Sequence, residues 1–118
     1  MKIEYKELIR LKDRFFWSVS GLRATWLNEK SFRQWSYLNV LSFFILASFD
    51  FTLIEILLLC CLGFFVLICE LFNSAIEATV DYISEDRHPV AKLAKDTSSA
   101  AVFLSAVVWG GAWLVIVI

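Results

Sequence analysis

Residues 51–69 read FTLIEILLLCCLGFFVLIC, and residues 70–77 follow directly as ELFNSAIE. The first nineteen residues carry one charge, Glu55, and as a helix they would cover roughly 28 Å, about the thickness of a bilayer core. Continued as one helix, the chain places an acidic and amide stripe within about an 80° arc, formed by Glu70, Asn73, Glu77 and Asp81. Acidic groups at the end of a membrane-type segment need partners, so this stripe is a candidate functional site.

The composition also indicates a membrane protein. The 118 residues are 59% hydrophobic with a mean hydropathy of +0.69, whereas soluble domains average about 45–50% apolar residues. Three segments have the low charge that a span of about 20 residues needs, namely residues 34–49, 51–69 and 98–118. The first has only sixteen residues, and its flanks, Arg33 and Asp50, can extend it by reaching toward the headgroups.

The amino-terminal segment has the pattern of a surface helix. Within residues 5–28, apolar residues recur at three- and four-residue steps between charged ones, and tryptophans suit the headgroup zone. A break is expected at residues 28–30, before the first span. We therefore predict an all-α membrane protein with one domain over residues 1–118, a surface helix at about 5–28 and three transmembrane helices.

The basic residues predict the orientation. Eight of eleven lie in the first 33 residues, and the others are Arg87, Lys92 and Lys95. The positive-inside rule places these segments in the cytoplasm and the carboxyl terminus outside. Glu70 then lies at the inner hydrocarbon boundary, and Glu77 lies about 10 Å further toward water. A carboxylate at lipid-hydroxyl depth beside one at soluble-ligand depth suits chemistry between a lipid and a soluble cofactor.

Other polar residues have ordinary interpretations as well as functional ones. Lys92, Lys95, Asp96 and Ser99 share one helix face, where the lysines either bind phosphate or pair and reach toward the surface. His88 lacks zinc-type partners and is interpreted as a loop residue, and the three cysteines as packing residues. Three helices alone would leave the polar stripe against lipid, so we predict a homo-oligomer in which copies of the chain cover it.

The stripe and its surroundings resemble the prokaryotic diacylglycerol kinase family. The resemblance rests on residues 70–81 (ELFNSAIEATVD), on Ala94-Lys95-Asp96 and on residues 99–102 (SAAV). Residues 21–26 (GLRATW) and 28–34 (NEKSFRQ) resemble its Gram-negative members. The resemblance covers the chain from about Arg10 onward, and no Gly-rich phosphate loop is present. It implies a homotrimeric kinase of the bacterial inner membrane that transfers the γ-phosphate of ATP to diacylglycerol, giving phosphatidic acid for phospholipid recycling.

The resemblance also implies roles for individual residues. Glu70 would be the general base, with Asn73 and Lys95 as further catalytic residues, and Mg²⁺ would be held by Glu29 and Glu77. The ATP-binding set would be Arg10, Trp17, Glu29, Glu77, Asp86, Arg87, His88, Lys95 and Asp96. The lipid-binding set would be Arg23, Ala24, Thr25, Trp26, Ser31, Phe32, Arg33, Gln34, Trp35, Glu70 and Ser99. The amino terminus would be cytoplasmic and the carboxyl terminus periplasmic.

Two alternatives stay open. Residues 88–96 are closer to the Gram-positive members, which phosphorylate undecaprenol, whereas the lipid-facing residues 21–34 favour diacylglycerol. A non-catalytic transporter or channel subunit would need polar groups through the full membrane depth, and the spans carry only Glu55 as a charge. Acyl-chain preference, regulation, and the location of the site within or between subunits do not follow from the sequence.

Overall fold

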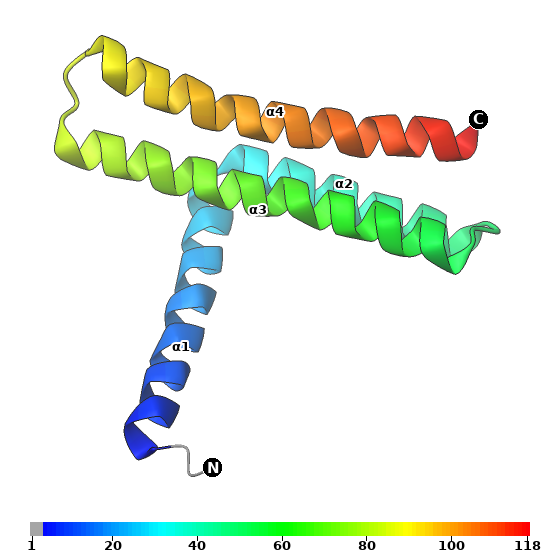
Figure 1. The fold of residues 1–118 in the computed structure, drawn as a ribbon, viewed down its shortest axis with the longest axis horizontal. Coiled ribbons are helices and arrows are strands. Elements are labelled where there is room, and N and C mark those ends of the chain that lie inside the picture. Colours follow the sequence, from blue (N-terminus) through cyan, green and yellow to red (C-terminus); the bar gives the residue numbers. More distant parts are fainter. Residues whose placement is uncertain (1–3) are drawn as a thin grey trace.

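The computed structural model describes residues 4–118, which form four helices and no strand. Helices α2, α3 and α4 lie side by side, and α1 leaves this bundle sideways (Figure 1). The helices span Tyr5–Asn28 (α1), Lys30–Ser48 (α2), Leu53–Ile83 (α3) and Pro89–Val117 (α4). The all-α prediction is confirmed.

Helix α1 has the amphipathic sequence of a surface helix, and the rest of residues 4–118 leaves it exposed. None of its residues is buried, and apolar side chains such as Leu11, Phe15 and Trp17 are well exposed. It ends where Glu29 adopts an extended backbone, and α2 begins at the next residue. This break lies where the sequence predicts it, and it turns the chain from α1 into the bundle.

Local hydrogen bonds set the starts of the two long helices. Thr52 and Glu55 form a capping box at α3, in which the Thr52 N–H donates to the Glu55 carboxylate at 2.9 Å and the Thr52 hydroxyl accepts from the Glu55 N–H at 3.2 Å. The one charge of the apolar run is therefore used at the helix end. At α4, the His88 ring Nδ1 accepts from the Val90 N–H, and Pro89 occupies the first turn.

Two helices are long and apolar enough to cross a membrane, α3 and α4. Helix α3 has 31 residues, which makes about 46 Å and exceeds the ~30 Å hydrocarbon core. A helix of this length is too long to lie wholly within such a core, and the acidic stripe occupies its carboxyl-terminal part. Most of the apolar surface of both helices is exposed. The remaining expected span, residues 34–49, coincides with α2 up to Ser48, where the helix ends, and polar side chains such as Asn39 and Ser42 lower its hydropathy.

The helices of the bundle approach one another closely at Gly63. A Cβ there would lie 2.3 Å from the Asn39 Oδ1 of α2 and 2.9 Å from the Trp109 ring of α4. The Asn39 amide donates to the Gly63 carbonyl at 3.1 Å and to the Trp35 carbonyl at 2.9 Å. Because glycine has no side chain, three helices meet closely at this point. The buried cluster beside it contains Leu46, Leu59, Val66 and Trp109.

Candidate functional site

Glu70 is the buried charged side chain of the described residues, with 4% of its surface exposed. It lies on α3 opposite the first turn of α2, where the Ser31 hydroxyl donates to its Oε2 at 3.3 Å. The turn at Glu29 brings Ser31 to this position, because α2 starts one residue before it. The structure therefore joins Glu70 to the predicted lipid set at the α1–α2 corner.

Two further carboxylates, those of Glu29 and Glu77, lie close enough to Glu70 for their charges to act on it. Within residues 4–118, the ion pairs are Lys95–Asp81 and Lys92–Asp96, so none of these three acids has a basic partner within 4 Å. The same residues contain no cluster of three or more His, Cys, Asp or Glu side chains arranged to hold a metal ion. Glu29 and Glu77 thus place two further acids around Glu70, and together they can supply part of a cation site.

Asn73 connects Glu77 to α4. Its amide Nδ2 donates to the Glu77 Oε1 at 3.4 Å, and its Oδ1 accepts from the Ser98 hydroxyl at 2.7 Å. Ser98 is buried, whereas Ser99, which the sequence analysis places in the lipid set, is exposed. Ser98 and Ser99 follow Lys95 by three and four positions, so either serine can lie on the same helix face as Lys95. Burial distinguishes them, and the sequence pattern does not.

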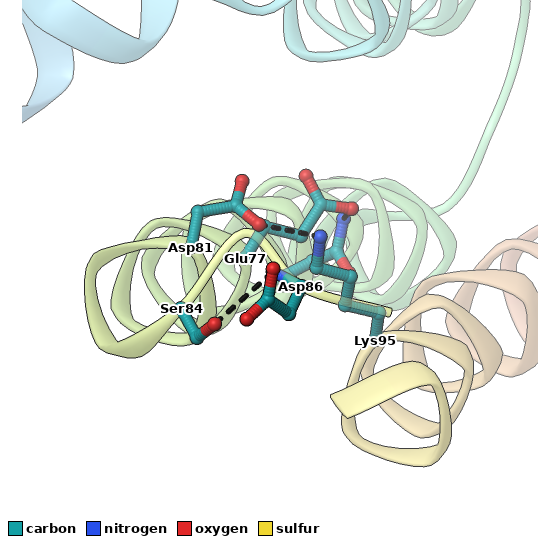
Figure 2. A network of polar contacts seen from close by, with 6 residues as sticks. Glu77, Asp81, Ser84, Asp86 and Lys95 are labelled. Carbon is teal, nitrogen blue, oxygen red and sulfur yellow. Dashed lines mark hydrogen bonds and ion pairs between the residues drawn. The ribbon is translucent and has the colours of Figure 1, made fainter. Parts of the chain in front are cut away.

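Lys95 reaches from α4 to α3 and pairs with Asp81 at 2.5 Å (Figure 2). The hydrogen bond that Lys95 donates to Asp81 raises the pKa of Lys95 above its ordinary value of 10.5, and the charge of Glu77 adds to the effect. Lys95 is therefore cationic at neutral pH and lies next to the acidic stripe. Asp81 belongs to the stripe but is not among the predicted site residues. Asp96 pairs with Lys92 on a more exposed part of α4.

The loop between α3 and α4 surrounds an open cavity of about 650 Å³. Ser84 shapes the loop, since its hydroxyl accepts from the Asp86 N–H at 3.1 Å (Figure 2). Lys95 points toward this region from α4. The cavity brings together most of the predicted ATP-binding residues of this part of the chain, namely Asp86, Arg87, His88, Lys95 and Asp96.

The structure does not bring Arg10 and Trp17 to that cavity. Both are exposed on α1, and neither lines it. The lipid-set residues at the end of α1 and the start of α2 do gather. The Arg33 guanidinium donates to the Trp26 carbonyl at 2.6 Å, and the rings of Trp26 and Phe32 meet edge to face. The remaining members Arg23, Ala24 and Gln34 are exposed, and Thr25 donates to the Gly21 carbonyl.

An apolar cavity of about 300 Å³ lies between α2 and α4. It runs from Trp35, a member of the lipid set, past Ser42 to Trp113, whose indole N–H donates to the Ser42 hydroxyl at 3.1 Å. Trp35 follows Ser31 by one helical turn, so this cavity begins near the Glu70 end of the bundle. The site therefore has a polar side toward the α3–α4 loop and an apolar side between α2 and α4.

Comparisons with known proteins identify the family of the chain. The family model for prokaryotic diacylglycerol kinase matches residues 16–117. A diacylglycerol kinase of Pseudomonas aeruginosa is 39% identical over 111 residues, which are 94% of this chain and 90% of that protein. Those of Escherichia coli K12 and Helicobacter pylori 26695 are 39% and 38% identical, over 85% and 88% of this chain and 82% and 81% of those proteins. The chain belongs to the prokaryotic diacylglycerol kinase family and is a kinase.

Proposed function

We propose that this chain transfers the γ-phosphate of ATP to the hydroxyl of diacylglycerol and releases phosphatidic acid at the cytoplasmic face of the inner membrane. The position of Glu70 carries the proposal. It is a buried carboxylate directly after the apolar run of α3, and it accepts a hydrogen bond from Ser31 of the predicted lipid set. The names of the relatives support diacylglycerol as the acceptor.

Glu70 would act as the general base. Ser31 holds one of its oxygens, which orients the carboxylate toward the α1–α2 corner. A base within hydrogen-bond reach of the lipid hydroxyl can take its proton as the phosphoryl group is transferred. The apolar cavity that begins at Trp35 offers space for an alkyl chain of the same lipid.

Glu29 and Glu77 would hold Mg²⁺. Magnesium sites at nucleotides commonly use one or two carboxylates and take their other ligands from phosphates and water. The two acids fit this pattern, because both lie close enough to Glu70 to act on its charge and neither has a basic partner within 4 Å among the described residues. The ion would neutralise charge on the phosphates, and Lys95, cationic and next to Glu77, would do the same from α4.

Glu29→Gln and Glu77→Gln test this assignment. Each variant should raise the Mg²⁺ concentration for half-maximal activity about tenfold or more, since each removes one anionic ligand. Glu7→Gln, an exposed acid on α1, is the control and should keep the wild-type Mg²⁺ dependence. An unchanged dependence in both site variants would remove the two acids from the magnesium site.

The functional unit would be a homotrimer in which α2 is the third span. Large apolar side chains of α2, such as Leu41, Phe43 and Phe44, are exposed in the single chain and suit lipid or a neighbouring copy. Helix α1 extends away from its own bundle (Figure 1). A neighbouring copy would give Arg10 and Trp17 a nucleotide to contact. The basic segments would place the amino terminus in the cytoplasm and the carboxyl terminus in the periplasm.

One assay separates the candidate functions. Radiolabelled ATP is supplied to the protein in mixed micelles that contain diacylglycerol and undecaprenol side by side. We expect label on diacylglycerol and its loss in Glu70→Gln. Label on undecaprenol alone would assign the chain to the undecaprenol branch, which residues 88–96 resemble. Label on neither lipid would refute lipid kinase activity and favour a non-catalytic membrane subunit.

A further inference from the structure

We propose that Ser98 is a positioning residue whose hydroxyl orients the Asn73 amide, so that the amide N–H faces Glu77. The consequence for Mg²⁺ rests on the proposed function, in which Glu77 is a metal ligand. The orientation itself rests only on contacts between α3 and α4. No part of the sequence pattern singles out Ser98 over the serine that follows it.

The distances define which atom donates. The Ser98 Oγ lies 2.7 Å from the Asn73 Oδ1. At this distance a proton must lie between the serine oxygen and the amide oxygen. An amide oxygen carries no proton, so the serine is the donor. On the other side of the same amide, Nδ2 lies 3.4 Å from the Glu77 Oε1. Asn73 thus connects Ser98 of α4 to Glu77 through two hydrogen bonds. Ser98 is 7% exposed, so water competes little for its hydroxyl.

The reversed amide is the competing arrangement. Nδ2 would then donate to the Ser98 Oγ, and the Ser98 proton would go to the Lys95 carbonyl, which is 2.9 Å away. This reversal would turn the Asn73 oxygen toward the Glu77 carboxylate, leaving two acceptors with no proton between them. The Glu77 carboxylate therefore decides which end of the amide faces it, and the Ser98 hydroxyl holds the other end in place. Without the hydroxyl, only the long contact to Glu77 would orient the amide.

A donor on one carboxylate oxygen limits how the carboxylate turns. Hydrogen bonds behind a metal ligand orient it, and their loss typically weakens metal binding about 10- to 100-fold. Ser98 does not contact Glu77 itself and acts through Asn73. Its loss should therefore weaken metal binding less, by about three- to tenfold. Ser98 also lies one helical turn after Lys95, so the same residue links the Lys95 turn of α4 to Glu77.

The test compares Ser98→Ala with Ser105→Ala. Ser105 is also buried on α4, but its hydroxyl donates to the Val102 carbonyl of its own helix. Mn²⁺ binding is measured by electron paramagnetic resonance in the presence of a non-hydrolysable ATP analogue. Ser98→Ala should weaken Mn²⁺ binding about three- to tenfold, and Ser98→Thr, which keeps a hydroxyl, should stay within about twofold of wild type. Ser105→Ala should match wild type.

A second readout needs no activity or metal. The chain has three asparagines, Asn28, Asn39 and Asn73, so ¹⁵N-asparagine labelling gives three side-chain amide pairs. Ser98→Ala should shift the Asn73 pair and leave the others, whose amides donate to the Ala24, Trp35 and Gly63 carbonyls. If that variant unfolds, Ser98→Cys, a weaker donor, should shift the same pair.

The outcomes separate the two proposals. An unmoved Asn73 pair, or equal weakening of Mn²⁺ binding in the Ser98 and Ser105 variants, would overturn the role of Ser98. A wild-type protein that transfers no phosphate to lipid would refute the proposed function instead. The amide spectrum would still decide whether Ser98 orients Asn73.

Discussion

Gly63→Ala should destabilise the bundle more than its small size suggests. The new Cβ would lie 2.3 Å from the Asn39 Oδ1, against the 3.4 Å at which ordinary contact begins, and 2.9 Å from Trp109. Asn39 can move away only by giving up its amide hydrogen bonds to the Trp35 and Gly63 carbonyls. Trp109 is 6% exposed and packed in the buried cluster, so its ring cannot easily move away from the new methyl group either.

The magnitude follows from two opposing terms. Overpacking of a closed interface costs about 1–3 kcal/mol. Alanine is favoured over glycine within a helix by about 0.8–1 kcal/mol, which offsets part of that loss. The net loss in the free energy of unfolding should therefore be up to about 2 kcal/mol. It can be measured by titrating sodium dodecyl sulfate into mixed micelles and following tryptophan fluorescence, since the Trp35 and Trp109 rings lie 6.4 Å apart in the same region.

Gly110→Ala is the matched control. Gly110 lies on α4, and a Cβ there would have no neighbour within 4 Å. This variant should be as stable as wild type or slightly more stable, because only the helix preference changes. If Gly63→Ala unfolds at the same detergent fraction as wild type, or if Gly110→Ala loses as much stability, the close approach at Gly63 does not determine how the helices pack.

Three further results are expected at the site. Glu70→Gln should lower kcat about 100-fold or more with unchanged helical circular dichroism, since an amide takes no proton; full turnover would exclude Glu70 as the base. Lys95→Gln should raise the KM for ATP about tenfold, while Lys92→Gln, whose side chain is 77% exposed, should stay within about twofold; equal effects would contradict a specific role. Asp81→Asn should lower the pKa of Lys95 toward 10.5, because the carboxylate that raises it is gone. Lys95 would then lose its charge earlier as the pH rises, and the alkaline limb of the activity profile should move to lower pH; an unmoved limb would rule this out.

Much of the fold could be predicted because it depends on local patterns. The apolar run and its acidic continuation indicate one long helix, and α3 continues unbroken through both. The amphipathic pattern is interrupted at residues 28–30, and the helix is interrupted there too, at Glu29. The use of Glu55 as a helix cap depends on its spacing from Thr52, a signal that the sequence analysis did not use. The role of Gly63 as a point of close helix approach could not be predicted, because a glycine in an apolar run does not reveal which residues of other helices lie opposite it.

The sequence by itself determined which residues can form a site. The stripe of Glu70, Asn73 and Glu77 follows from helix periodicity, and periodicity acts within one element. The tertiary structure decided which partners these residues meet. Ser31 reaches Glu70 through the turn between α1 and α2, and Ser98 rather than its neighbour reaches Asn73 through the packing of α4 on α3. Adjacent positions on a helix differ by about 100°, so burial and hydrogen bonding become definite only when a second helix is in place.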